Sequence, residues 1–124
     1  MKQYLIDTSV IVDYLRKNKR AASFLNSLDQ IVISVITAGE IYQGAKDKKE
    51  LKSIKKLFKF FKILPIDEQI SQLSLKLLEK YTLSNGLLIL DSIIAAAAIK
   101  NNLTLITGNF KHFKMIKDLK VEKW

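Results

Sequence analysis

Short apolar runs alternate with longer stretches of helical spacing along the chain. The short runs are rich in β-branched and other apolar residues, a composition that favours strands over helices. Each run is three to five residues long, which suits the strands of a small sheet. The pattern predicts strands at Lys2–Ile6, Ile31–Ile33, Lys62–Leu64 and Leu103–Ile106, with a short final strand around Val121.

Helices are predicted between these runs, and several follow a residue whose side chain can cap a helix. Ser9 can cap a helix that runs to about Lys17. Thr37 can cap another, with Glu40 three residues further on, as in a capping box. Asp67 can cap a long helix that ends before Ser84-Asn85-Gly86. The remaining helices are expected at Ala21–Leu28, Lys48–Phe61 and about Leu90–Lys100.

Strands that alternate with helices predict an α/β domain of three layers, α/β/α, with a central and mostly parallel sheet. In such sheets, binding and catalytic sites form at the carboxyl ends of the strands. Asp7 and Asn109 each lie just past a predicted strand. Glu40 lies on the helix after the second strand, and Asp91 opens its own helix. We therefore expect these four residues to converge on one rim of the sheet.

Composition narrows the chemistry that the chain can perform. Its 124 residues and 48% hydrophobic content fit a folded chain, and we expect a single domain over residues 1–124. The chain has no cysteine, and His112 is its only histidine, so zinc sites built on cysteines or on two histidines are excluded. No signal-peptide pattern opens the sequence, and the longest apolar run, Ile93–Ile99, is far below the ~20 residues that span a bilayer. A cytoplasmic location is the expectation.

Three acids lie in mainly apolar stretches of this basic chain, whose formal net charge is +9. Asp7, Glu40 and Asp91 can each be explained alone, as a helix cap, part of a capping box and a helix-start residue. Together at one rim they would repel, by about 4 kcal/mol for a pair ~4 Å apart at an effective dielectric of 20. A hard divalent cation such as Mg²⁺ relieves that repulsion and can activate water for phosphodiester hydrolysis. The basic exterior then points to a nucleic acid as substrate.

Four segments, taken in order, resemble the motifs of PIN domains, and their spacing is similar to that of the VapC toxins of VapBC toxin–antitoxin systems. The segments cover nearly the whole chain: Leu5-Ile6-Asp7-Thr8-Ser9-Val10-Ile11-Val12, Ser34–Gly44 around Glu40, Leu90-Asp91-Ser92-Ile93-Ile94-Ala95-Ala96, and Leu105–Phe113. The resemblance implies a PIN-like fold and an endoribonuclease that requires Mg²⁺ or Mn²⁺. It also implies an RNA substrate, a VapB-type antitoxin partner and a homodimer.

The resemblance assigns roles to individual residues. Asp7 and Asp91 would be the principal metal ligands, Glu40 would complete the acidic cluster, and Thr8 and Thr107 would be supporting hydroxyls. The fourth segment departs from the family's acidic pattern, because Asn109 and His112 stand where members often have an acid. Asn109 is taken as the catalytic candidate there, but either residue can replace the fourth acid, and one metal or two remain open.

Two other functions stay in view beside the nuclease. The neutral fourth segment suits a catalytically weak PIN module that binds RNA or a protein partner. A phosphotransfer domain with Asp7 as nucleophile ranks lower, because Ser9 stands where that chemistry wants a second acid. The eight lysines between Lys46 and Lys62 can follow RNA phosphates, although the solvated face of a packed helix is the simpler interpretation.

Overall fold

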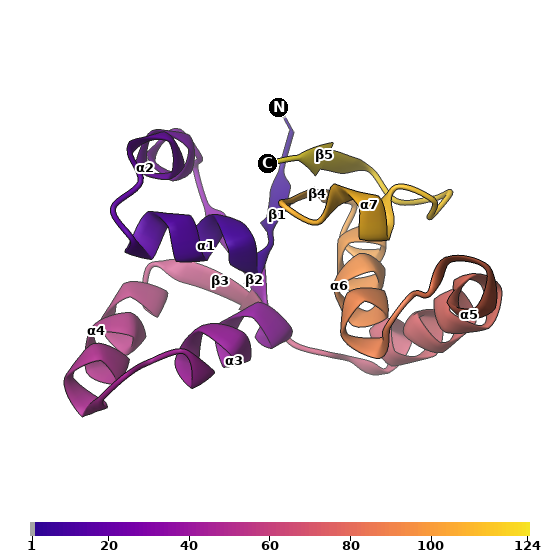
Figure 1. The fold of residues 1–124 in the computed structure, drawn as a ribbon, viewed down its shortest axis with the longest axis horizontal. Coiled ribbons are helices and arrows are strands. Elements are labelled where there is room, and N and C mark those ends of the chain that lie inside the picture. The colour runs from indigo at the N-terminus through magenta and orange to yellow at the C-terminus, as the bar shows by residue number, and fades with distance from the viewer. Residues whose placement is uncertain (1) are drawn as a thin grey trace.

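The computed structural model describes residues 2–124, which form five strands and seven helices (Figure 1). The elements in chain order are β1 (Tyr4–Ile6), α1 (Thr8–Leu15), α2 (Lys19–Asn26), β2 (Ile31–Ser34), α3 (Val35–Gln43), α4 (Lys48–Phe58), β3 (Phe61–Leu64), α5 (Glu68–Asn85), α6 (Ile89–Lys100), β4 (Thr104–Thr107), α7 (Phe110–Phe113) and β5 (Val121–Lys123).

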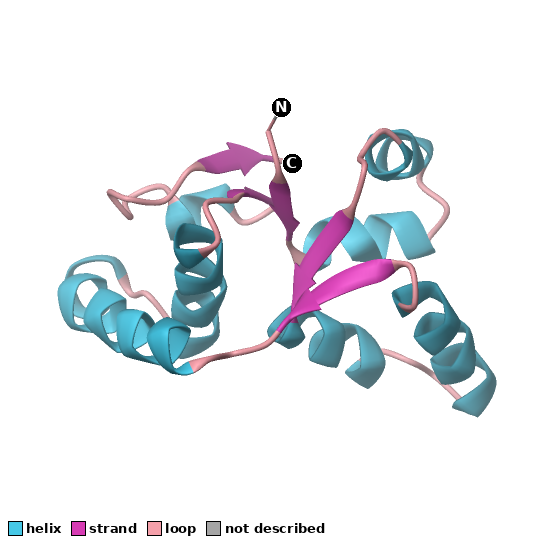
Figure 2. Ribbon diagram, turned by 180° about the vertical axis from the view of Figure 1, so that it is seen from behind, coloured by secondary structure: helices cyan, strands magenta, loops and turns pink. Residues whose placement is uncertain are grey.

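The strands form one sheet in the order β3-β2-β1-β4-β5, and every neighbouring pair is parallel. The chain therefore builds outward from β1 in both directions, and the carboxyl ends of β1 and β4 lie side by side. The register pairs Ile6 with Ile106. Only Leu5 and Val32 pair between β1 and β2, and β2 and β3 turn away from the other strands there (Figure 2). The α/β fold with a parallel central sheet is confirmed.

Two apolar cores lie on opposite faces of the sheet, because successive strand residues point to opposite sides. Leu5 and Leu105 pack into the core beneath α5 and α6. Ile6 and Ile106 pack into the core beneath α1, α3 and α4. Figure 1 shows α1 to α4 on one side of the strands and α5 to α7 on the other. This arrangement produces the three layers that the sequence predicts.

Two predicted helix caps are wrong, and both corrections move the helix start toward the amino terminus. The cap position of α1 is Asp7 rather than Ser9. The cap of α3 is Ser34, whose hydroxyl accepts the backbone N–H of Thr37 at 3.1 Å. In both places more than one cap-forming residue lies near the start of the helix, so sequence spacing alone does not select the first. The cap at Asp67 is confirmed, because its carboxylate accepts the N–H of Ile70.

Smaller boundary differences also have physical reasons. The amphipathic helix ends at Phe58, and Phe61 instead begins β3, where it pairs with Ile31. Helix α5 stops at Gly86, which takes the left-handed conformation (φ 70°) that glycine adopts without steric cost. Among residues 2–124, no helix combines the length and the apolar character needed to cross a membrane.

Candidate active site

Asp7 lies at the carboxyl end of β1, directly beside the end of β4. Its backbone N–H donates to the carbonyl of Ile106 at 3.1 Å, which continues the strand pairing by one residue. Its side chain is 5% exposed. The buried hydroxyl of Thr107 donates to Oδ2 of Asp7 at 2.5 Å, and the backbone N–H of Asn109 donates to that same hydroxyl at 3.0 Å. Residues on β4 and in the loop after it thus fix the carboxylate.

The position of Asp7 at the start of α1 does not make it a conventional helix cap. Its backbone is extended (φ −77°, ψ 162°), but its side chain makes no capping hydrogen bond to the helix. The carboxylate turns toward Thr107 instead, so helix capping does not account for the residue. The negative charge still lies at the positive end of the helix dipole, where an anion is favoured.

Ser9 and Gly108 join the first turn of α1 to the loop after β4. The N–H of Gly108 donates to the Ser9 hydroxyl at 2.9 Å. A Cβ at position 108 would lie 3.1 Å from Ser9 Oγ and 3.2 Å from Ser9 Cβ, closer than ordinary packing allows. The two segments therefore approach each other at a distance that suits glycine. This hydrogen bond is a second connection between α1 and the loop after β4, and the sequence did not predict it.

Glu40 lies in the second turn of α3, because that helix begins at Val35. It does not close a capping box with Thr37. Its Oε1 instead accepts the Thr8 hydroxyl at 2.7 Å, and the hydroxyls of Thr8 and Thr37 lie 3.2 Å apart. Glu40 is exposed, whereas Thr37 is 1% exposed. The hydrogen bond from Thr8, the first residue of α1, therefore brings Glu40 toward the rim that holds Asp7.

Asp91 lies in the first turn of α6, with a side chain 21% exposed. Burial raises the pKa of its carboxyl, His112 opposes the rise, and Asp7 and Glu40 add to it. Nδ1 of His112 lies 3.8 Å from Oδ2 of Asp91. Asp91 therefore lies near enough to both Asp7 and Glu40 for their negative charges to raise the pKa of its carboxyl. The sequence predicted this convergence from strand and helix ends.

Asn109 and His112 occupy the fourth segment in different ways. Asn109 is exposed and contributes its backbone N–H to Thr107, while its side chain makes no capping bond to α7. His112 is largely exposed, but its imidazole faces Asp91. Of these two residues, it is His112 whose side chain lies against one of the acids. The catalytic role expected of Asn109 stays a prediction.

The donor atoms at the rim have the chemistry that a hard cation prefers. Asp7, Glu40, Asp91 and the two threonine hydroxyls offer oxygen only, and a cation between the acids would offset the repulsion that helps to raise the Asp91 pKa. Within residues 2–124, however, no group of three acidic or histidine side chains is tight enough to hold a metal ion directly. The arrangement fits the Mg²⁺ habit of binding through one or two carboxylates and keeping several waters. The three-ligand set stays a prediction.

The protein is thus an all-parallel α/β domain with Asp7 at the end of a strand and Glu40 and Asp91 near the starts of two helices. The sequence model of the PIN domain matches residues 4–118, and the chain belongs to this family. PIN-domain ribonucleases depend in general on a divalent metal.

Individual relatives extend the match over nearly the full chain. Ribonuclease VapC1 of Methanocaldococcus jannaschii is 34% identical over 116 residues, which are 92% of this chain and 81% of the relative. Among solved structures, VapBC-1 from nontypeable Haemophilus influenzae is 32% identical with a TM-score of 0.81, and the match covers 98% of this chain and 97% of that one. VapBC2 from Rickettsia felis, bound to a DNA fragment from its promoter, is 27% identical with a TM-score of 0.78, covering 98% of each chain.

Proposed function

We propose that this protein is a metal-dependent endoribonuclease, the toxin component of a type II toxin–antitoxin system. The observation that carries the proposal is the buried Asp7 carboxylate, which Thr107 holds at the strand ends where Asp91 and Glu40 also lie. Relatives that match most of this chain are named ribonucleases, which supports the reaction class. Neighbouring structures named as VapBC or toxin–antitoxin complexes support the toxin role.

Each rim residue takes a distinct role in this proposal. Asp7 and Asp91 are the principal ligands of a divalent cation, Mg²⁺ with Mn²⁺ as a substitute, and Glu40 completes the set. Thr107 orients Asp7, and Thr8 orients Glu40. Asn109 holds the Thr107 hydroxyl through its backbone and offers its side chain to water or substrate.

The chemistry is hydrolysis of an RNA phosphodiester by water. When bound, a divalent cation polarises a phosphoryl oxygen and acidifies water, which supplies nucleophile and charge stabilisation at neutral pH. The protein itself positions the groups. The Thr107 hydroxyl is committed to Asp7 and the Thr8 hydroxyl to Glu40, so both serve as orienting donors rather than as nucleophiles. The resulting reaction has no covalent enzyme intermediate.

Partners and setting complete the proposal. A VapB-type antitoxin binds and inhibits the protein, and the protein acts as a homodimer and a single PIN domain over residues 1–124. Cellular RNA as substrate implies a cytoplasmic location. Expression of the protein alone should arrest growth. Co-expression with a VapB-type antitoxin should prevent that arrest and yield a complex on size-exclusion chromatography. Light scattering of the free protein should give twice the monomer mass.

Cleavage of total cellular RNA by the purified protein tests the activity itself. We expect discrete fragments with Mg²⁺ and none with EDTA, and mapping their ends identifies the target. Asp91→Asn should remove cleavage while the circular dichroism spectrum stays unchanged. Fragments that persist in EDTA, or an Asp91→Asn variant of wild-type activity, would contradict the proposed site.

A second candidate is a PIN module that binds RNA or a protein partner with weak catalysis. Two observations favour it: Asn109 brings no charge to the rim, and no three ligands are grouped among residues 2–124. It predicts salt-sensitive RNA binding without metal-dependent fragments. Fragments that EDTA abolishes exclude it.

A further inference from the structure

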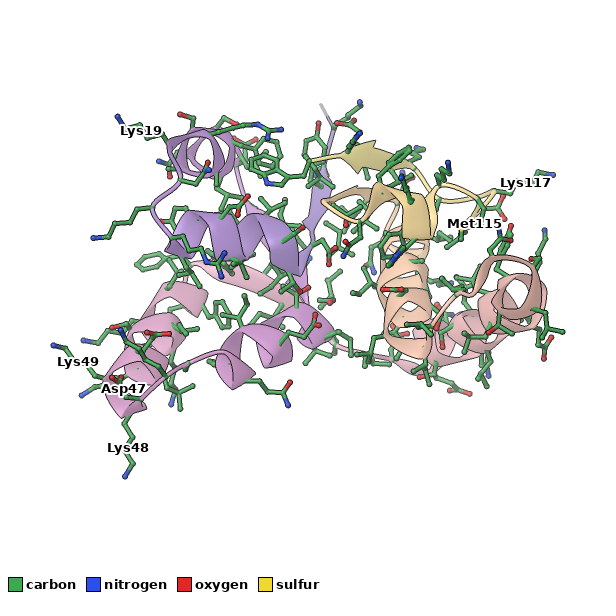
Figure 3. The ribbon with its side chains drawn as sticks, viewed as in Figure 1. Lys19, Asp47, Lys48, Lys49, Met115 and Lys117 are labelled. Atoms are coloured by element: carbon green, nitrogen blue, oxygen red, sulfur yellow. The ribbon has the colours of Figure 1, made fainter. Side chains whose placement is uncertain are left out.

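The densest positive charge of the protein lies on α4 and its C-cap. Six exposed lysines occupy this short segment: Lys48, Lys49, Lys52, Lys55, Lys56 and Lys59. The only acid inside the helix is Glu50, which is partly buried. Its Oε2 lies 3.9 Å from Nζ of Lys46. Asp47 is committed to the helix N-terminus, where it accepts the N–H of Glu50. Lys48 and Lys49 point away from the body of the protein, at the opposite end from Lys117 (Figure 3).

Helical geometry places three of these lysines beside a groove. Residues three and four apart share a helix face, so Lys49, Lys52 and Lys56 form one row, with Ser53 between the first and the last. Ser53 lines a groove of ≈ 480 Å³ between α1, α3 and α4, together with Arg16 and Glu40. The row therefore borders a groove that includes one of the rim carboxylates.

The lysine row is unlike an ordinary solvated helix face. Such faces commonly mix acids and bases at three- and four-residue spacing, which yields favourable pairs. None of Lys49, Lys52 and Lys56 has an acid three or four residues away in either direction. Instead they are spaced to repel one another. A polyanion relieves this repulsion, whereas water and salt only reduce it.

We infer that Lys49, Lys52 and Lys56, with Arg16 in the adjacent groove, form the surface that contacts RNA phosphates flanking the cleaved bond. The inference rests on the proposed function and extends it to the path of the substrate. Besides Arg16 and Ser53, the groove is lined mainly by apolar residues and by Glu40 and Glu50, so the RNA strand follows the lysine border and reaches Arg16 without entering the groove floor. Phosphate contacts of this kind fix position and carry no base preference.

RNA binding without cleavage tests the surface separately from the nuclease activity. The probe is a fluorescein-labelled single-stranded RNA of mixed sequence, followed by anisotropy in EDTA over a range of salt. The test variant is Lys49→Gln/Lys52→Gln/Lys56→Gln. The matched control, Lys76→Gln/Lys80→Gln/Lys117→Gln, removes the same charge from exposed positions outside α4.

We expect weaker binding by the α4 variant, with the slope of log affinity against log salt reduced in magnitude by about 2, since each phosphate contact on a single strand contributes about 0.7. The control should keep the wild-type slope. The α4 variant removes the mutual repulsion of these lysines, so its melting temperature at low salt should equal or exceed that of the wild type. If the lysines stabilised the fold, the melting temperature would fall instead.

Equal losses in both variants would overturn the surface, because binding would then follow total charge alone. Wild-type binding by the α4 variant would also overturn the proposed surface. The lysines of α4 would then be a solvated helix face or a contact for an acidic protein segment. Either result is compatible with full RNA cleavage, so failure of this surface and failure of the proposed nuclease are distinguishable.

Discussion

Thr107 donates a 2.5 Å hydrogen bond to Oδ2 of Asp7, although the two residues lie 100 positions apart in the chain. The contact exists because β1 and β4 are parallel neighbours whose ends coincide. Both side chains are buried, with Thr107 fully enclosed and Asp7 5% exposed. A buried carboxylate that accepts a strong hydrogen bond is held in one orientation.

Replacement of Thr107 tests how much the rim depends on this hydroxyl. Thr107→Val keeps the shape but removes the donor to Asp7 and the acceptor for the Asn109 N–H. We expect a loss of about 1–3 kcal/mol in unfolding free energy, the usual cost of an unpaired buried polar group. RNA cleavage should fall as well. Thr107→Ser, which keeps the hydroxyl, is the control, and urea unfolding of both variants is the measurement.

Asp91 should make stability depend on pH in a direction set by its raised pKa. The pKa of the Asp91 carboxyl is higher in the folded protein than its ordinary value of 3.8, so folding favours the protonated form of this group. As the pH rises above 3.8, keeping the group protonated or burying its charge lowers the free energy of unfolding. Asp91→Asn should therefore be more stable than wild type at neutral pH in EDTA. The difference should shrink as pH falls toward 3.8 and vanish below it. Thermal unfolding of both proteins across this range is decisive, and a variant less stable than wild type at neutral pH would contradict the account.

A side chain at Gly108 should destabilise the protein, because a Cβ there meets the Ser9 side chain at 3.1–3.2 Å and Ser9 would have to shift. We expect Gly108→Ala to cost about 1–3 kcal/mol, as overpacking of a tight contact does. Gly39 is the matched control, since a Cβ there meets nothing within 4 Å and the residue lies inside α3. Gly39→Ala should stabilise the protein by about 0.5–1 kcal/mol. Equal effects of the two substitutions on urea midpoints would refute the close approach.

Much of the fold follows from sequence because its signals are local. The β-branched run at Ile31 and the short runs at Tyr4 and Leu103 have few alternatives to a strand. The boundary at Phe61 was harder to place. Phe58 and Phe61 are spaced as on one helix face, and only pairing of Phe61 with Ile31 assigns it to the sheet. Such a pairing joins distant segments, so helical periodicity cannot reveal it.

The site shows the same division between local and distant information. Convergence of Asp7 and Asp91 was predicted, Asp7 from the end of a strand and Asp91 from the start of a helix. The partner of Glu40 was not, because the capping-box pattern at Thr37 competes with the true cap at Ser34. The hydrogen bond from Thr8 to Glu40 depends on how α1 packs against α3. The hydrogen bond between Gly108 and Ser9 depends on how closely the loop after β4 approaches α1. Neither packing distance is encoded in residue spacing.

RNA cleavage by an Asp7→Asn variant tests the central claim most directly. Asparagine keeps the size and the acceptor for Thr107 but removes the charge, and Asp118→Asn makes the same change at an exposed position outside the rim. With saturating Mg²⁺ and equal amounts of folded protein, we expect Asp118→Asn to cleave like wild type and Asp7→Asn to lose nearly all cleavage. Wild-type cleavage by Asp7→Asn would contradict the account, because the rim carboxylate would then play no part in the reaction.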